Sequence, residues 1–139
     1  MTTTPTNFTW PIRVYYEDTD AGGVVYYANY LKFMERARTE WLRQFGIEQD
    51  GYLADGIAFV VRHVDVNYHA SARFNAELEV SCNIIQLRKA SLTVEQTVSS
   101  SDQNQQFVSG QVTLACVDLT RNKPVAIPKP IMEVLTRVG

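Results

Sequence analysis

Hydrophobic and polar residues change their period along the chain, and each change indicates a different kind of element. Between Tyr27 and Phe45 apolar residues recur at three-and-four spacing with charged residues on the opposite face, which predicts one long helix. Gly46 follows at the position where a left-handed residue commonly ends a helix. Further along the chain the period becomes two, which is typical of strands. The expected strands span residues 58–69, 76–87, 91–98 and 106–119.

Shorter elements are expected around this framework. IRVYYED, residues 12–18, predicts a strand before the helix, and residues 48–56 predict a loop with a short helical turn. A polar hairpin loop is expected over residues 99–106, and a short helix after Pro130. One strand, a helix and four more strands without later alternation favour an α+β fold with an antiparallel sheet around the helix. The length of 139 residues predicts a single domain over residues 1–139.

Composition narrows the classes of function. The net charge of -2 gives no electrostatic reason to expect nucleic acid as a partner, and no apolar run is long enough to span a membrane. MTTTPTNFTWP lacks the basic start and apolar run of a signal peptide, so we expect a cytoplasmic protein. Cys82 and Cys116 have no C-x-x-C spacing, and we expect no disulfide between them. No residues have metal-ligand spacing, so we predict no metal and no cofactor.

The stretch YYEDTDAGGVVYYANY, residues 15–30, concentrates acids and glycines just before the predicted helix. The simplest interpretation is a solvated turn with acids near a helix N-terminus. A calcium loop of the EF-hand type is excluded, because Gly22 stands where a calcium-binding side chain is needed and Asn29 stands where Glu is needed. An aspartyl-phosphate enzyme would need a parallel sheet, and the G-x-x-x-x-G-K-[ST] phosphate loop is absent.

Acyl transfer is the remaining interpretation. Unpaired N–H groups at the helix start near Tyr27 can polarise a carbonyl oxygen. Asp20, on the preceding loop, can attack the same carbonyl carbon or activate a water molecule beside it. Glycines at 22 and 23 allow an acyl group to approach the backbone closely.

Residues 16–30 fit the motif Y-x-D-x-D-x-x-G-[VI]-V-[YFW]-[HYF]-x-x-Y, and the chain therefore resembles the hotdog-fold acyl-CoA thioesterases of the 4-hydroxybenzoyl-CoA thioesterase type. Within this family it is most similar to the group encoded with the bacterial Tol-Pal envelope system. The resemblance extends over AFVVRHVDVNYHASARF and LRKASL. It implies a five-stranded antiparallel sheet wrapped around one central helix. It also implies association through the sheets into homodimers or homotetramers, with active sites at the subunit interface and a role in lipid metabolism.

The resemblance also assigns residues. Asp20 matches the catalytic carboxylate of the family, Tyr27 supplies the backbone N–H that polarises the thioester carbonyl, and Asp18 is left a structural role as a turn or capping acid. Close relatives often carry His where this chain has Tyr27, which we interpret as tuning of the pocket. Residues expected to bind the substrate, with the last two contacting the phosphates of coenzyme A, are Gly22, Gly23, Val24, Val25, Arg88 and Lys89.

Several alternatives stay open from the sequence. Asp20 is either a nucleophile or a general base for water. The chain is alternatively a non-catalytic module that binds acyl-CoA or acyl carrier protein, or a 3-hydroxyacyl dehydratase, although His63 and His69 both lie on the polar face of one strand rather than on the helix. Glu35 is a possible second carboxylate, more simply interpreted as an ion-pair partner of Arg38 or Lys32.

Overall fold

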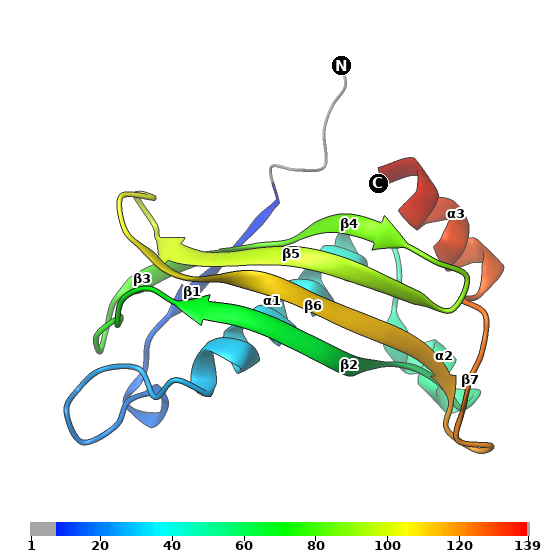
Figure 1. Cartoon of the computed structure of the whole chain (residues 1–139), viewed down its shortest axis with the longest axis horizontal. Coiled ribbons are helices and arrows are strands. Elements are labelled where there is room, and N and C mark those ends of the chain that lie inside the picture. The colour runs from blue at the N-terminus through cyan, green and yellow to red at the C-terminus, as the bar shows by residue number, and fades with distance from the viewer. Residues whose placement is uncertain (1–7, 139) are drawn as a thin grey trace.

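A curved antiparallel sheet surrounds one long helix (Figure 1). The structure is a computed structural model, and it describes residues 8–138. Residues 1–7 lie outside the described part. They make up most of the stretch MTTTPTNFTWP, for which we expect no signal peptide. The elements are β1 (Thr9–Arg13), the 3-10 turn η2 (Tyr16–Asp18), α1 (Asn29–Gln44), α2 (Gln49–Ala54), β2 (Ile57–Tyr68), β3 (Glu77–Ser81), β4 (Asn83–Leu87), β5 (Ser91–Ser100), β6 (Gln106–Asp118), β7 (Lys123–Pro124) and α3 (Lys129–Val138).

The sheet has the order β1-β3-β5-β6-β2, and all its pairs are antiparallel. The expected α+β class with a sheet wrapped around one helix is confirmed. The described strands number seven rather than five, because the strand expected over residues 76–87 is divided at Cys82 and because β7 pairs with β6. At the division, the Ser81 hydroxyl accepts the Thr97 N–H and the Ser81 carbonyl accepts from the Gln96 amide. Side-chain hydrogen bonds thus replace the regular ladder at this point.

The apolar stripe of α1 supplies the centre of the core. Phe33, Met34 and Ala37 are fully inaccessible to solvent, and they face buried valines of the sheet such as Val94 and Val98. Burial of one such large side chain stabilises the fold by about 1.5–3 kcal/mol. The predicted helical face is therefore correct.

The predicted boundaries of this helix differ slightly from those observed. Tyr27 and Ala28 form a turn before α1, so the helix starts two residues later than expected. At the other end Gly46 has φ of 82° and its N–H bonds to the Arg43 carbonyl, which confirms the expected left-handed cap.

The strand expected over residues 12–18 is wrong at its C-terminal half, because β1 ends at Arg13 and the chain turns through η2. Asp18 causes this turn. Its carboxylate is buried, accepting the Tyr15 N–H at 2.9 Å and the Asn29 side-chain amide at 3.0 Å. Its backbone carbonyl accepts the Tyr26 N–H. Asp18 therefore ties the turn to the first residue of α1, and its predicted structural role is confirmed.

A β-bulge changes the pattern that we expected for β2. One extra residue, Arg62, shifts the register between Val61 and His63. Val61 and Val64 consequently lie on the same side of the strand, facing α1, and the simple alternation expected from Val60 to Tyr68 is broken. Val61 and Val64 remain 47% and 37% exposed, because α1 does not extend over this edge of the sheet.

Three smaller expected elements are confirmed. A short helix, α2, lies in residues 48–56, the polar hairpin joins β5 to β6, and α3 forms near Pro130. Cys82 and Cys116 are buried free thiols, and burial raises the pKa of Cys82 to about 12. In residues 8–138 no helix is both long and apolar enough to cross a bilayer.

Candidate active site

The loop between β1 and α1 folds back as a tight hairpin with Asp20 near its tip. The backbone of Thr19 bridges to Val25, the Asp20 N–H bonds to the Val24 carbonyl, and the Gly23 N–H returns to the Asp20 carbonyl. Asp20 is exposed, and its Oδ1 accepts the Gly22 N–H at 2.8 Å. The second carboxylate oxygen accepts no hydrogen bond from the described residues. The acid is therefore oriented by the backbone and still free to react.

The two glycines of this hairpin differ in what the backbone requires of them. Gly23 has φ of 79°, a conformation that L-residues with a side chain rarely adopt. A Cβ atom on Gly22 would lie 3.3 Å from Asp20 Oδ1, tighter than ordinary contact. Of the two valines expected to touch substrate, Val24 is half-buried, whereas Val25 is 4% exposed and belongs to the core.

Tyr27 begins the turn that leads into α1. The N–H groups of Asn29 and Tyr30 bond back to the carbonyls of Tyr26 and Tyr27, but the Tyr27 N–H has no acceptor within residues 8–138. Asp20 and Tyr27 lie on opposite arms of the hairpin, on either side of the backbone hydrogen bond from the Tyr26 N–H to the Asp18 carbonyl.

Aromatic side chains hold the helix start in position. The Tyr27 ring packs edge-on against Tyr68 at the end of β2, with centroids 6.0 Å apart. Tyr68 also contacts Tyr30, whose hydroxyl accepts the Ala72 N–H at 2.9 Å. Desolvation by burial raises the pKa of both Tyr68 and Tyr30, so both phenols stay neutral near pH 7. The C-terminal end of β2 therefore supports the backbone around Tyr27.

Arg88 and Lys89 occupy the turn between β4 and β5, and both side chains are exposed. The backbone around them is fixed, since the Arg88 N–H bonds to the Ser91 carbonyl and the Lys89 carbonyl accepts the Ile127 N–H. Neither side chain forms an ion pair within the described chain. Both are free to bind an anion.

The structure does not bring these two basic residues to Asp20. Figure 1 shows the loop between β1 and α1 at the left end of the sheet and the turn between β4 and β5 at the right end. The pairing agrees: Leu78, near the first loop, pairs with Ser100 at the end of β5, whereas Arg88 adjoins its start at Ser91. Ten residues of β5 separate the two ends by about 30 Å. One chain alone therefore does not bring the two groups to one substrate.

Two grooves meet beside α1, on the side that faces β2. One has a volume of about 220 Å³ and runs past Leu31 and Val64, and the other, of about 300 Å³, runs past Leu42 and Leu114. The first lining is mainly apolar, whereas the second mixes apolar side chains with polar ones such as Thr39 and Gln49. Both share the residues Glu35, Arg38 and Val61.

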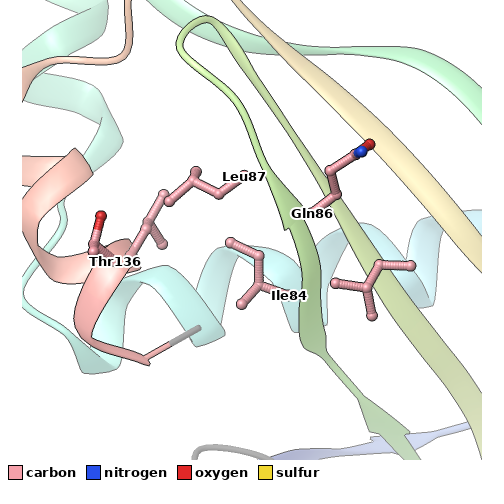
Figure 2. Close-up of a pocket in the computed structure, with 6 residues that line it drawn as sticks. Ile84, Gln86, Leu87 and Thr136 are labelled. Carbon is pink, nitrogen blue, oxygen red and sulfur yellow. The ribbon is translucent and has the colours of Figure 1, made fainter.

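A third groove, of about 280 Å³, lies between β4 and α3. In Figure 2, Ile84 and Leu87 of β4 point toward α3, which carries Thr136, and Gln86 points away from it. A bulge at Ile85 gives Ile84 and Leu87 this common orientation. No residue predicted for the site lines this groove.

Known proteins resemble this chain in sequence and in fold. A family model described as Thioesterase-like superfamily matches residues 14–135. The chain belongs to this thioesterase-like family. It is 46% identical over 127 residues to the acyl-CoA thioester hydrolase YbgC of Escherichia coli, covering 91% of this chain and 94% of that protein. It is 44% identical over 125 residues to the acyl-CoA thioesterase YbgC of Haemophilus influenzae, with coverage of 89% and 90%.

A solved structure agrees with these relatives. The 1,4-dihydroxy-2-naphthoyl-CoA thioesterase from Synechocystis superposes with a TM-score of 0.86 at 25% identity, covering 93% of this chain and 95% of that one. The resemblance to hotdog-fold thioesterases and the expected class of enzyme, a thioester hydrolase, are therefore confirmed. The roles of the individual residues stay predictions.

The sequence pattern did not predict the burial of two polar residues of this thioesterase-like chain. Gln96 is fully buried between β5 and α1, donating to the carbonyls of Met34 and Ser81 and accepting from Arg38. Arg38 is itself only 7% exposed. The sequence did contain a signal of this burial. Gln96 lies on the same face of its strand as Val94, which is apolar, and Arg38 borders the apolar stripe of the helix.

Other candidates are located away from the hairpin. His69 hydrogen bonds through Nε2 to the Ser109 hydroxyl at 2.7 Å, and His63 follows the bulge of β2. Glu35 forms no ion pair with Arg38 or Lys32 among the described residues, so that expected pairing is not observed. Within residues 8–138 no three His, Cys, Asp or Glu side chains gather as they would around a metal ion.

Proposed function

We propose that this thioesterase-like protein hydrolyses acyl-CoA thioesters to a free acid and coenzyme A. The observation that carries the proposal is the Tyr27 N–H, which has no acceptor in residues 8–138 and lies at the start of α1, on the same hairpin as the exposed carboxylate of Asp20. The relatives with an acyl-CoA thioesterase name support the substrate class.

The Tyr27 N–H binds the thioester oxygen. As the carbonyl carbon becomes tetrahedral, negative charge develops on this oxygen, and the N–H together with the positive end of the α1 dipole stabilises it. One well-placed backbone donor of this kind lowers the barrier by about 3–4 kcal/mol. Any residue at position 27 supplies this backbone group, so the Tyr27 side chain is not required for it.

Asp20 completes the reaction in one of two ways. As a general base, it takes a proton from water while the water oxygen attacks the carbonyl carbon, and coenzyme A leaves as the thiol after protonation of its sulfur. As a nucleophile, its carboxylate attacks the carbonyl carbon and expels the coenzyme A thiolate, which is then protonated, and water hydrolyses the anhydride that remains. Both routes consume one water and yield one acid and one thiol.

We further propose that two copies of the chain share each site. β2 is the last strand of the sheet and offers a free edge of 12 residues with exposed apolar side chains. When two such edges pair antiparallel, the Tyr68 end of one strand adjoins the Ile57 end of the other. Asp20 lies at the first end and Arg88 and Lys89 at the second, so the acid of one subunit and the basic turn of its partner act on the same coenzyme A.

A thiol-release assay tests the proposed activity. Purified protein is incubated with acyl-CoA thioesters of increasing chain length and with aromatic acyl-CoA, and free thiol is followed with a disulfide reagent. We expect turnover with at least one class of acyl group. Tight binding without thiol release would instead support a non-catalytic binding module, and water loss from 3-hydroxyacyl thioesters would support a dehydratase.

Arg88→Ala combined with Lys89→Ala should raise KM for acyl-CoA about tenfold and change kcat little, because each charged contact to phosphate contributes about 1 kcal/mol or more at an exposed site. The measurement is steady-state kinetics at two salt concentrations, and the variant should lose part of the salt dependence of KM. A thioester truncated before the phosphates serves as the control substrate and should be hydrolysed equally by both proteins. A similar rise in KM for the truncated substrate would contradict phosphate binding.

A further inference from the structure

The hairpin that carries Asp20 turns at two glycines, Gly22 and Gly23. Glycine leaves the backbone more conformational freedom than any other residue, so this turn does not fix itself. Asp20 is exposed, and no packing of its side chain holds the carboxylate in place. A displacement of a reacting group by about 1 Å can cost about 10²-fold in rate. Contacts from outside the hairpin therefore decide how firmly Asp20 is held.

The segment between β2 and β3 supplies such contacts along the second arm of the hairpin. Its Ala72 carbonyl accepts the Val25 N–H at 2.8 Å. Two residues later, the Phe74 N–H donates to the Gly23 carbonyl at 3.1 Å. Phe74 is thus the residue of this segment that binds the glycine turn itself.

The ring of Phe74 stacks on the ring of Tyr16. The two ring centroids are 4.0 Å apart, and the ring planes differ by 8°. Tyr16 lies in η2, just before the first arm of the hairpin. Its carbonyl accepts both the N–H and the hydroxyl of Thr19, the residue at which that arm begins. The stack therefore joins the chain that enters the hairpin to the segment that lies beside its second arm.

This aromatic pair is not part of the hydrophobic core. Tyr16 is 77% exposed and Phe74 is 40% exposed, and neither ring belongs to the cluster of buried residues around α1. The pair therefore contributes little to the apolar burial that stabilises the fold. Two aromatic rings in contact still attract each other beyond the area that they bury. A local role at the hairpin explains the pair better than a role in folding.

We infer that Tyr16 and Phe74 are positioning residues, and that their stack clamps the hairpin in the geometry in which the Asp20 carboxylate reacts. The inference rests on the role proposed above for Asp20 and names the residues that hold it. When the rings separate, Phe74 moves more freely and the Gly23 carbonyl loses its fixed donor. The turn then takes up positions from which Asp20 does not reach the carbonyl carbon or its water. Neither ring has to contact the substrate for this effect.

Tyr16→Ala and Tyr16→Phe form the matched pair that tests the clamp in catalysis. Tyr16→Ala should lower kcat for thiol release about tenfold and leave KM within about twofold of the wild type, because the carboxylate is misplaced while the binding surface stays. Tyr16→Phe keeps the stacked ring and should retain the wild-type kcat. Tyr15→Ala is the control for loss of an exposed ring. Tyr15 is 61% exposed and pairs with no aromatic ring in residues 8–138, so this variant should also retain the wild-type kcat.

Amide hydrogen exchange measures the clamp without any turnover. In Tyr16→Ala the peptide that spans the hairpin should exchange about fivefold faster than in the wild type, whereas peptides of β5 and β6 should exchange at the wild-type rate. Phe74→Ala removes the same stack from the other side and should reproduce the faster exchange and the lower kcat. The double variant should be no more impaired than either single one, because both substitutions abolish one contact.

Wild-type exchange in the hairpin of Tyr16→Ala, or an unchanged kcat, overturns the inference. A raised KM at unchanged kcat also overturns it, since the ring would then bind substrate, and so does an equal loss in Tyr16→Phe, since the hydroxyl would then be responsible. If Tyr16→Ala does not fold, Phe74→Ala compared with Tyr16→Phe gives the same decision. A wild-type protein that releases no thiol from any thioester contradicts the proposed activity, and the exchange rates alone then decide on the clamp.

Discussion

Asp20→Asn should reduce kcat for thioester hydrolysis by about 10²–10⁴-fold, the range for loss of a general base. Asparagine retains the side-chain oxygen that accepts the Gly22 N–H, so the hairpin and the Tyr27 N–H stay in place. It lacks the basicity to accept a proton from water and the charge to attack a carbonyl carbon. The measurement is thiol release under saturating acyl-CoA, with thermal unfolding to establish that stability is unchanged.

Asp102→Asn is the matched control. Asp102 Oδ1 accepts the backbone N–H two residues later, at 3.0 Å from Asn104, in the same way as Asp20 accepts from Gly22, and it is also exposed. It lies in the hairpin between β5 and β6, outside the proposed site. Activity within tenfold of the wild type in Asp20→Asn, with Asp102→Asn unaffected, would show that Asp20 is not the catalyst.

The two roles of Asp20 differ in where the water oxygen ends. In a single turnover in heavy-oxygen water, a general base directs the label into the acid that is released. Hydrolysis of an anhydride by attack on its aspartyl carbon places the label in the Asp20 carboxylate. Mass spectrometry of the peptide that contains Asp20 distinguishes these outcomes.

Gly110→Ala should destabilise the fold by about 3 kcal/mol, the upper end for overpacking in a closely packed interior. A Cβ atom on Gly110 would lie 2.6 Å from Val66 Cα and would overlap with the Asp65 carbonyl oxygen. Both are backbone atoms of β2 and cannot move aside by a change of rotamer. β2 must shift away from β6, and the shift reaches Tyr68 and the aromatic support of the helix start. Chemical denaturation of both proteins at one protein concentration measures the effect.

Gly51→Ala provides the comparison for this substitution. Gly51 lies in α2, and nothing is within 4 Å of the Cβ that an alanine would add. Because alanine favours helix over glycine by about 1 kcal/mol, this variant should be as stable as the wild type or more so. A Gly110→Ala protein with unchanged stability would mean that β2 adjusts at no cost.

Most of the fold could be predicted from the sequence because periodicity records which face of an element is buried. α1 and the main strands follow from it directly. The bulge at Arg62 could not be predicted, because a bulged residue does not differ in type from its neighbours. It changes only which side of the strand the later side chains face. The division at Cys82 also escaped prediction, because it depends on hydrogen bonds from Gln96, which is distant in sequence.

The candidate site was less accessible to prediction. The hairpin that carries Asp20 and the turn before α1 are local in sequence, and the motif therefore located them. The basic turn at Arg88 is distant from them in space, and the spacing of residues along the sequence does not indicate this distance. The pairing of Glu35 with a base of its own chain was expected from helical spacing, yet no such ion pair is present among the described residues.

The length of β5 has a consequence for how this protein behaves in a cell. About 30 Å of strand separates Asp20 from Arg88 and Lys89, so in the proposed enzyme a lone chain holds two half-sites that do not serve one substrate. Under the proposed sharing of sites, the active fraction follows mass action, and specific activity falls as the protein is diluted below its dissociation constant. The amount of protein that is synthesised then sets both the number of chains and the fraction of them that is associated and active.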